Sequence, residues 1–332
     1  LCTAHLVSEL IAPDRNITIA TLLYNFSREN FVSTEEIRQS FGEDVAKLVQ
    51  GLINISSLYT KQAAVEDDNF HKLLFTFAED IRVIIIMIVD RLQLLRRINH
   101  HPDEKFVRDI SSEARYLYAP LAHRLGLYTI KSELEDLSLK YLNRKIYTQI
   151  AEKLNETKEV RDSYVTHFIE PIRERLQDSN IKFEIKGRTK SINSIWNKMK
   201  KKDVDLNEMY DLFAIRIILD TPQKQEKQDC WIAYSIVTDI YTANVSRLKD
   251  WISIPKSNGY ESLHITVKGP QSKWVEVQIR TKRMDEIAER GLAAHWKYKG
   301  TQSEGDVDKW MNNVRAVLEA GASGQMGRIR EM

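Results

Sequence analysis

Hydrophobic residues recur at intervals of three and four along the first half of the chain, and this period predicts amphipathic helices. Gly126 is expected at a helix C-cap, and Pro171 is expected to kink or break the helix that contains it. The first half is therefore predicted to be all-α. The predicted helices are Glu35–Leu48, Asn69–Asn99, Ser112–Gly126, Ile130–Asn155 and Thr157–Gln177.

Beyond Ile181, short β-prone runs alternate with helical segments, which predicts an α/β domain. We therefore expect a multidomain protein, with an all-α domain over residues 1–140, including linking helices, and an α/β domain over residues 141–332. The predicted strands are Lys182–Lys186, Tyr210–Asp220, Trp251–Ile254, Ser262–Lys268 and Trp274–Arg280, and the predicted helices are Gly187–Lys202, Asp229–Tyr241 and Asp285–Lys299.

Two of these strands carry charges that a buried strand does not need, since unpaired charges are costly to desolvate. Two acidic strands that meet in one sheet would make a site for a metal ion and a nucleotide. The alternative is an ordinary sheet with an ion pair at its edge. The polar positions are Asp211 and Arg216 in the first strand, and Glu276, Gln278 and Arg280, which alternate with Val275, Val277 and Ile279, in the second.

The separation between Asp211 and Arg216 raises a geometric problem. These residues are five apart, so an unbroken strand would place them on opposite faces. Either Asp211 precedes the strand or a bulge intervenes.

The segment from Lys186 to Lys202 contains seven Lys or Arg residues and no acid. Lys190, Ser194 and Lys198 are spaced four apart, on one face of a helix, while Ile192, Ile195, Trp196 and Met199 fall on the other face as core. Cations near a helix N-terminus favour polyphosphate. The alternative is a solvated basic face that contacts nucleic acid.

A third cluster is SRLKDWISIPKSNGYESLH, residues Ser246–His264, whose Pro-Lys-Ser-Asn-Gly run predicts a turn. Tyr260 after this turn can present its ring to a base. The alternative is that Tyr260 packs on its own sheet. The polar candidates here are Arg247, Lys249, Lys256, Asn258 and His264.

Composition adds little to this picture. The 49 basic and 47 acidic residues nearly balance, so attraction to polyphosphate must come from a local cluster. Cys2 and Cys230 provide neither a disulfide framework nor zinc spacing, which fits a reducing cytoplasm. The longest apolar run, Val83–Val89, is too short to cross a bilayer. The chain begins inside a helical pattern, so we expect a fragment of a longer protein.

The motifs together resemble the RelA/SpoT homologues, the bacterial (p)ppGpp enzymes. GRTKSINSIWNKM, YDLFAIR, RLKDWISIPKSNGYESLH, VEVQIRT and AERGLAAHWKYK resemble the synthetase domain. FGEDVAKLV, EDIRVIIIMIVDRL and YAPLAHRLG resemble the HD-type hydrolase domain. The resemblance implies a helical HD-type domain followed by a nucleotidyltransferase-like mixed sheet. The regions through which long members contact ribosome and tRNA are not in this sequence, so no such partner is expected.

By this resemblance, the second domain transfers the β,γ-pyrophosphate of ATP to the ribose 3′-hydroxyl of GDP or GTP, with Mg²⁺ as cofactor. Asp211 would hold Mg²⁺, and Glu276 would activate the hydroxyl or share the metal. The other implied roles are adenine sandwiched by Arg188 and Arg216, ATP phosphates held by Lys190, Ser194 and Lys198, guanine stacked on Tyr260, and support of the nucleotides by Arg247, Lys249, Lys256, Asn258, His264, Gln278 and Arg280.

The first half departs from hydrolase-competent members. Where these carry a His-Asp pair and then Glu-Asp, this chain has Tyr24 and Asn25, and then Arg28 and Glu29. Tyrosine and asparagine are poor ligands for divalent metals, and Arg28 brings a positive charge. The family's first histidine corresponds to Thr3, or else to the nearby His5, and a later asparagine has become Leu94. Asp90 is retained, and we expect it to form an ion pair with a neighbouring arginine.

We therefore expect a cytoplasmic synthetase whose hydrolase-like domain is inactive and regulatory. The basic RLKD at residues 247–250 is nevertheless the version typical of members that both synthesise and hydrolyse. One alternative is a catalytically silent pseudoenzyme that senses guanine nucleotides, although such a binder would not need both Asp211 and Glu276. Another is a nucleic-acid-binding protein that uses the basic helix, which the near-neutral charge disfavours. ATP and GDP or GTP are the expected partners, without nucleic acid or membrane.

Overall fold

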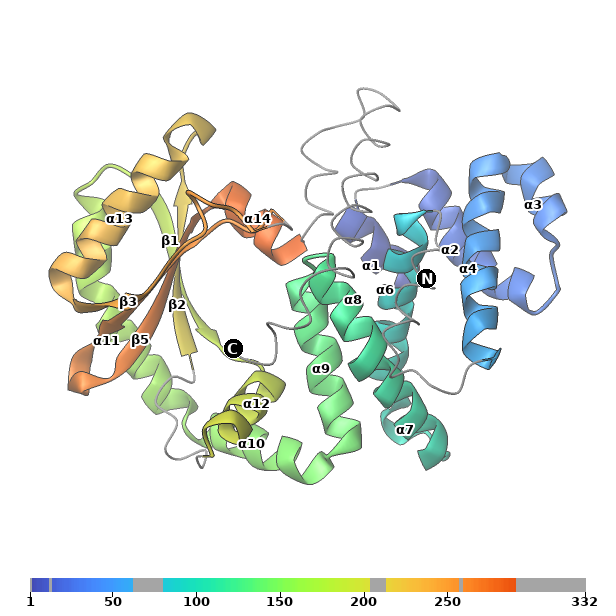
Figure 1. Ribbon diagram of the computed structural model, residues 1–332, viewed down its shortest axis with the longest axis horizontal. Helices are drawn as coiled ribbons and strands as arrows, with labels where there is room; N and C mark the ends of the chain where they lie inside the picture. Colours follow the sequence, from blue (N-terminus) through green and yellow to red (C-terminus); the bar gives the residue numbers. More distant parts are fainter. Residues whose placement is uncertain (1, 12–13, 62–79, 204–212, 257–258, 291–332) are drawn as a thin grey trace. The chain divides into compact units, whose positions relative to one another are not determined.

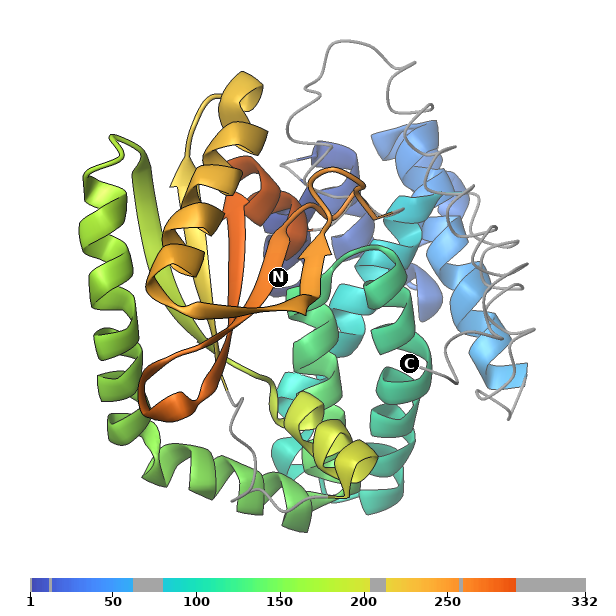
Figure 2. The ribbon, with the colours of Figure 1, turned by 60° about the vertical axis from the view of Figure 1, so that its left-hand side comes forward.

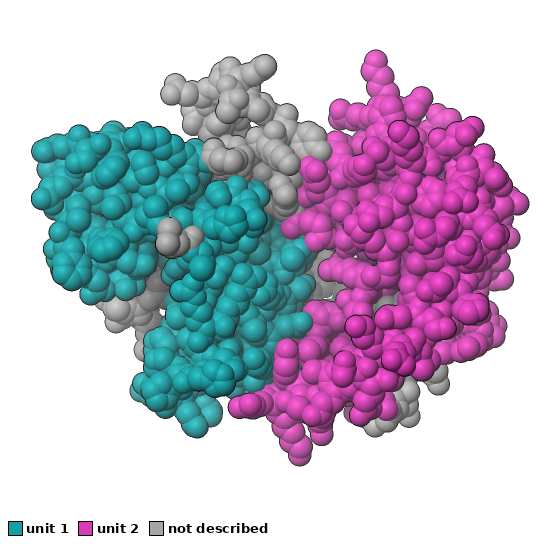
Figure 3. All heavy atoms as spheres, turned by 180° about the vertical axis from the view of Figure 1, so that it is seen from behind, with its two compact units in different colours: residues 1–142, 290–332 teal, residues 143–289 magenta. Residues whose placement is uncertain are grey.

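The computed structural model describes residues 2–11, 14–61, 80–203, 213–256 and 259–290. The chain divides into two compact units, residues 1–142 with 290–332 and residues 143–289, which Figure 3 shows in different colours. The change from one unit to the next, after Leu142, lies close to the residue 140 chosen from the sequence.

The first unit is helical throughout its described residues (Figure 1). A 3₁₀ turn (η1, Ile98–His100) follows α6, and a π-helical turn (η2, Ala114–Tyr118) joins α7 to α8. The α-helices are α1 (Cys2–Ile11), α2 (Arg15–Arg28), α3 (Thr34–Phe41), α4 (Glu43–Lys61), α6 (Ile81–Arg97), α7 (Glu104–Glu113), α8 (Ala119–Arg124) and α9 (Tyr128–Leu142).

Three helices predicted as single segments are divided in the structure. The predicted helix Glu35–Leu48 ends at Gly42, whose φ of +95° favours glycine, and α4 starts after it. The predicted helix Ile130–Asn155 is divided at Asn143, whose backbone is not helical and whose side chain caps the N-terminus of α10. The predicted Ser112–Gly126 helix contains the π turn, and it stops at Gly126 (φ +72°), as expected.

Helix α6 lies in the hydrophobic core of the first unit. Its apolar residues are buried on most sides, including Ile84, Ile88 and Leu92, and the helix packs against α1, α4, α8 and α9. Asp80 caps its N-terminus by accepting from the backbone N–H of Arg82. Residues 69–79 of the predicted helix lie outside the described residues.

The second unit contains a five-stranded mixed sheet in the order β1-β2-β5-β4-β3. Only the β2–β5 pair is parallel. The helical first unit and this sheet confirm the predicted fold class. The elements of this unit are α10 (Arg144–Glu156), α11 (Lys158–Gln177), β1 (Lys182–Thr189), α12 (Ile192–Lys202), β2 (Phe213–Asp220), α13 (Glu226–Ile240), β3 (Thr242–Asp250), β4 (Leu263–Lys268), β5 (Trp274–Thr281) and α14 (Lys282–Arg290).

Two predictions for this unit were wrong. The basic helix begins at Ile192 rather than Gly187, because residues 187–189 continue β1 and pair with β2. The strand predicted at Trp251–Ile254 lies earlier, as β3, and residues 251–253 form a turn. At Pro171, of the two predicted outcomes, a break does not occur: helix α11 runs through this residue, with Phe168, Ile172 and Leu176 buried along it.

The two faces of the sheet have different surroundings (Figure 2). Helices α11 and α13 contact one face, where their apolar residues join a core that includes Ile215, Val277 and Ile279. Period-two alternation then places the polar residues of β2 and β5 on the opposite face. This polar face contains the candidate active site.

Candidate active site

The polar face is built by strand register. Glu276 of β5 lies beside Ala214 of β2, and Gln278 lies beside Arg216. On the other side of β5, His264 of β4 is opposite Gln278. The expectation that the two acidic strands meet is therefore confirmed for their described residues, as is the alternation of Glu276, Gln278 and Arg280 with core valine and isoleucine side chains.

Glu276 lies at the centre of this face. Gln278 Nε2 donates a 2.7 Å hydrogen bond to Glu276 Oε1, and His264 Nδ1 lies 3.6 Å from the same oxygen. Burial alone would raise the pKa of Glu276, but His264, the Gln278 hydrogen bond and the charge of Lys190 together lower it. A carboxylate held ionised in this way can accept a proton or contact a cation.

Burial lowers the pKa values of Lys190 and His264, whereas it would raise that of Glu276. Burial lowers the pKa of Lys190, although Glu276 opposes that change. Burial likewise lowers the pKa of His264 to about 3, with the charge of Lys249 adding to the effect and Glu276 opposing it. At neutral pH the imidazole is therefore uncharged, and Glu276 has lysine as its nearby cation.

Tyr260 is 9% exposed and belongs to an aromatic cluster. Its hydroxyl lies 2.8 Å from His264 Nε2, and its ring meets the Trp251 ring edge-on at 5.6 Å. Lys256 Nζ lies over the Trp251 ring at 4.0 Å and 5.3 Å from the Tyr260 ring centre. This arrangement corresponds to the alternative in which Tyr260 packs on its own sheet, so stacking on guanine stays a prediction.

Farther along the same face, Arg216 and Arg280 are both buried. They contact two carboxylates of α14, Asp285 and Glu289. Neither carboxylate was singled out from the sequence, although their four-residue spacing on a predicted helix was a usable signal. Trp251 was also missed, because the segment around it was assigned to a strand.

The basic helix has a different start from the one predicted. Ser191 caps α12 by accepting from the backbone N–H of Ser194, and the two hydroxyls are 2.7 Å apart. Lys190 precedes the helix, so the four-residue spacing does not place it on a helical face with Ser194 and Lys198. Lys190 still interacts with the Lys198 side chain and with Glu276. Ile195 packs against Ile150, as expected for the apolar side of α12.

The remaining predicted residues are more peripheral or fall outside the described range. Arg188 is on β1, opposite Ala214, and is exposed. Arg247 and Lys249 are exposed on β3, where Lys249 is opposite His264. Asp211 and Asn258 lie outside the described residues.

Glu276 fits a hard divalent cation such as Mg²⁺, which prefers carboxylate oxygens. Oε1 of Glu276 accepts the hydrogen bond from Gln278, and Oε2 of Glu276 has no hydrogen-bond partner among the described residues. Those residues include no group of three or more His, Cys, Asp or Glu side chains arranged to hold a metal. A second carboxylate ligand would have to come from a residue such as Asp211.

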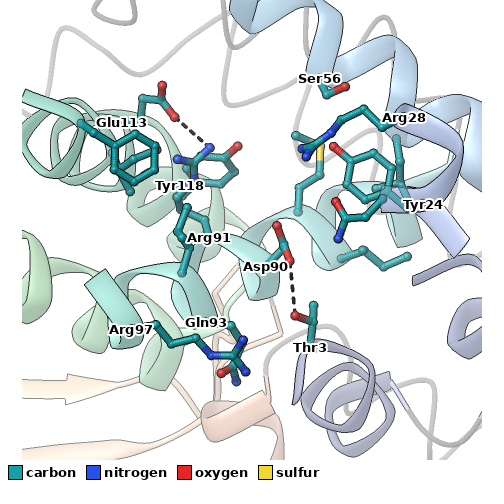
Figure 4. A pocket seen from close by; sticks show the side chains of 17 residues that line it. Thr3, Tyr24, Arg28, Ser56, Asp90, Arg91, Gln93, Arg97, Glu113 and Tyr118 are labelled. Carbon is teal, nitrogen blue, oxygen red and sulfur yellow. Dashed lines mark hydrogen bonds and ion pairs between the residues drawn. The ribbon is translucent and has the colours of Figure 1, made fainter. Parts of the chain in front are cut away.

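The first unit contains a pocket of about 530 Å³ between α2, α4, α6 and α7 (Figure 4). Of the two candidates for the position of the family's first histidine, Thr3 lines the pocket, whereas the His5 side chain is 76% exposed and is not part of its lining. The other departures predicted from the sequence also line it, namely Tyr24, Asn25, Arg28 and Leu94, together with Asp90.

Asp90 does not have the partner that we expected. It accepts a hydrogen bond of 3.3 Å from Thr3 Oγ1, and no described arginine forms an ion pair with it. The adjacent Arg91 instead pairs with Glu113 at 2.9 Å and lies over the Tyr118 ring (Figure 4). Arg91 is turned toward Glu113 of α7, so the expected ion pair was wrong.

Comparisons with known proteins agree with both units. Residues 187–303 match the profile of a region found in RelA/SpoT proteins, and residues 1–128 match that of an HD domain. A GTP pyrophosphokinase of Photobacterium angustum is 36% identical over 331 residues, which are 95% of this chain and 44% of that protein. A guanosine-3′,5′-bis(diphosphate) 3′-pyrophosphohydrolase of Aquifex aeolicus is 37% identical over 304 residues, or 91% and 42% of the two chains.

Among solved structures, the small alarmone synthetase 1 of Bacillus subtilis bound to pppGpp has a TM-score of 0.33 and 23% identity, covering 55% of this chain and 97% of that one. The present chain spans less than half the length of the curated relatives that it matches. No described helix has both the length and the hydropathy needed to cross a membrane.

Proposed function

This chain belongs to the RelA/SpoT family, with an HD domain and a RelA/SpoT synthetase region, and we propose that its second unit is a GTP pyrophosphokinase. The reaction transfers the β,γ-pyrophosphate of ATP to the ribose 3′-hydroxyl of GDP or GTP. Curated relatives named for this activity match most of the chain. The observation that carries the proposal is the placement of Glu276 on a sheet face shared with Arg216 and His264, with Lys190 near enough to interact with its carboxylate.

In the proposed reaction, Glu276 takes the proton from the 3′-hydroxyl as its oxygen forms a bond to the β-phosphorus of ATP. The bond between that phosphorus and the oxygen bridging to the α-phosphate breaks, and AMP leaves with the bridging oxygen. Because charge accumulates on the phosphoryl oxygens, nearby cations stabilise the transition state. Lys190, which interacts with Lys198 of α12, supplies positive charge next to Glu276.

The two nucleotides would bind at neighbouring positions on the polar face, since Tyr260 lies near enough to Arg216 and Arg280 to interact electrostatically with both. Arg216, with Arg188 on the neighbouring strand, would stack on adenine, and the Tyr260–Trp251 cluster with Lys256 would receive the guanine nucleotide. When bound, Mg²⁺ would neutralise charge on the pyrophosphoryl group, and Glu276 and Asp211 are the residues that would hold it. The lowered pKa of Glu276 supports this role, because it keeps the carboxylate ionised at neutral pH.

We further propose that the first unit does not hydrolyse (p)ppGpp, although some relatives carry a pyrophosphohydrolase name. Hydrolysis of this kind needs several imidazole and carboxylate ligands on one metal ion. The pocket instead presents Tyr24, Asn25 and Arg28 around Asp90, which is hydrogen-bonded to Thr3. Its role would be to regulate the synthetase.

The synthetase proposal is tested by incubating the chain with ATP, GDP and Mg²⁺ and separating the nucleotides by anion-exchange chromatography. We expect AMP and a guanine nucleotide with two additional phosphates to appear in equal amounts. Omission of GDP should abolish AMP release. AMP release that does not depend on a guanine nucleotide would contradict the proposal.

A further inference from the structure

Two arginines are buried close together on the polar face of the sheet. Arg216 of β2 lies beside Gln278 of β5, and Arg280 is two residues beyond Gln278 on the same face. Arg216 is 8% exposed and Arg280 is 1% exposed. Burial, together with the neighbouring charge of Arg216, lowers the pKa of Arg280. Such a pair of like charges is stable only where anions compensate it.

Helix α14 supplies the anions. It starts directly after β5, and Asp285 and Glu289 are four residues apart, on one helical face. Asp285 Oδ1 lies 2.7 Å from Arg280 Nε and 3.3 Å from Arg216 Nη1. Glu289 Oε1 lies 2.8 Å from Arg216 Nη1 and 3.4 Å from Arg280 Nη2. Each carboxylate therefore bridges both guanidinium groups.

The guanidinium of Arg216 is held from one side. Its Nη1 donates to Glu289, whereas Nε and Nη2 are buried and have no hydrogen-bond partner. Among the described residues, the α14 carboxylates are thus the groups that fix how Arg216 is turned. Glu289 contacts the edge of the Arg216 guanidinium and not its flat face, which is the surface through which a guanidinium stacks on a nucleobase.

We propose that Asp285 and Glu289 are positioning residues that hold Arg216 in the orientation needed to stack on the adenine of ATP. This inference rests on the proposed function, in which Arg216 contacts the donor nucleotide. It extends that function to α14, which would act on ATP affinity through Arg216 without touching the substrate. The guanine nucleotide would contact the Tyr260–Trp251 cluster and not the Arg216 guanidinium, so its affinity should change little.

The test compares Glu289→Gln and Asp285→Asn with Glu286→Gln, a control on the same helix whose carboxylate forms no ion pair among the described residues. Affinities for a non-hydrolysable ATP analogue and for GDP are measured by calorimetry, beside the melting temperature. We expect each positioning variant to weaken ATP-analogue binding about tenfold, the scale of one hydrogen bond to a charged group. GDP affinity should change less than twofold, and the control should match the wild type.

Glu289→Asp provides a second variant should charge removal impair folding, since it keeps the charge but withdraws the carboxylate by one methylene. The same selective loss of ATP-analogue affinity is expected. Lower melting temperatures with unchanged affinity for both nucleotides would overturn the inference. They would indicate that the two carboxylates only compensate the charges of the buried arginines. If the wild type binds the ATP analogue but makes no pyrophosphorylated product, the proposed function fails, and the affinities still decide the role of α14.

Discussion

Gln278 donates a 2.7 Å hydrogen bond to Glu276, two residues earlier on the same strand, and so fixes one carboxylate oxygen at the centre of the polar face. This contact leaves the second oxygen available to a proton or a cation. The proposed chemistry depends on the negative charge of this group, and the first prediction removes that charge.

Glu276→Gln should reduce pyrophosphate transfer by about a thousandfold or more, since general-base and metal contributions are lost together. The substitution keeps the size of the side chain, so the melting temperature should stay near that of the wild type. Glu184→Gln is the matched control, since Glu184 is exposed on β1 and pairs with Lys186. Normal transfer by a folded Glu276→Gln protein would rule out the assigned role.

Tyr260→Ala should raise the Michaelis constant for GDP by an amount that corresponds to roughly 1–3 kcal/mol, the scale of base–aromatic stacking. The Michaelis constant for ATP should hardly change. Tyr260→Phe keeps the ring and loses only the hydroxyl contact with His264, so it should retain most of the affinity for GDP. Equal damage to both constants in the alanine variant would favour a purely packing role in the Trp251 cluster.

The first unit should leave ppGpp intact when the protein is incubated with Mn²⁺. The pocket places Thr3, Tyr24, Asn25 and Arg28 with Asp90, and its other carboxylate, Glu113, is paired with Arg91, so the ligand set for a divalent cation is poor. Product release is followed by chromatography, and Mn²⁺ binding by electron paramagnetic resonance. Pyrophosphate release that Asp90→Ala abolishes would show that the pocket is a working hydrolase.

The two cysteines should differ in reactivity. Burial raises the pKa of the Cys230 thiol to about 12, with nearby acidic groups adding to the effect, whereas Cys2 is exposed. Because the thiolate is the reactive form, a thiol reagent at pH 8 should label Cys2 quickly and Cys230 only after denaturation. Two fast-reacting thiols in the native protein would contradict the buried position of Cys230.

The raised pKa of Cys230 also predicts how the stability of the protein depends on pH. The folded pKa of Cys230 lies above the ordinary value of 9.0, so the folded state holds its proton more tightly than the unfolded state. Its contribution to the free energy of unfolding is therefore complete below about pH 9 and is lost as pH rises toward 12. Denaturant titrations of the wild type and Cys230→Ala should show that the free energy of unfolding falls less in the variant over this pH range. An equal loss in both proteins would argue against the shift.

The residues of β5 that lie on the polar face could be predicted from local sequence. Alternation in Trp274–Arg280 was enough to separate Glu276, Gln278 and Arg280 from the core side of β5, since strand period does not depend on neighbours. The spacing of Ile192, Ile195 and Met199 likewise identified the apolar side of α12. Both patterns are set by residues close together in the chain.

Other features depend on contacts between distant segments. Gly187 reads as a helix start, yet it is part of β1 because it pairs with Ile215 of β2. Polar β3 is a strand because it pairs with β4 at the edge of the sheet. The approach of α14 to Arg216, across more than seventy residues of sequence, likewise requires the β2–β5 pairing to be known. None of these could be read from periodicity alone.

The most direct test of the proposed function follows two labels from ATP to the guanine nucleotide. ATP labelled at the β-phosphate and, separately, at the γ-phosphate is incubated with GDP and Mg²⁺, with Glu276→Gln as the inactive control. The proposal predicts that both labels enter the 3′-position of the guanosine product and that one AMP appears for each product formed. Transfer of the γ-label alone with release of ADP, or binding of both nucleotides without transfer of either label, would contradict it.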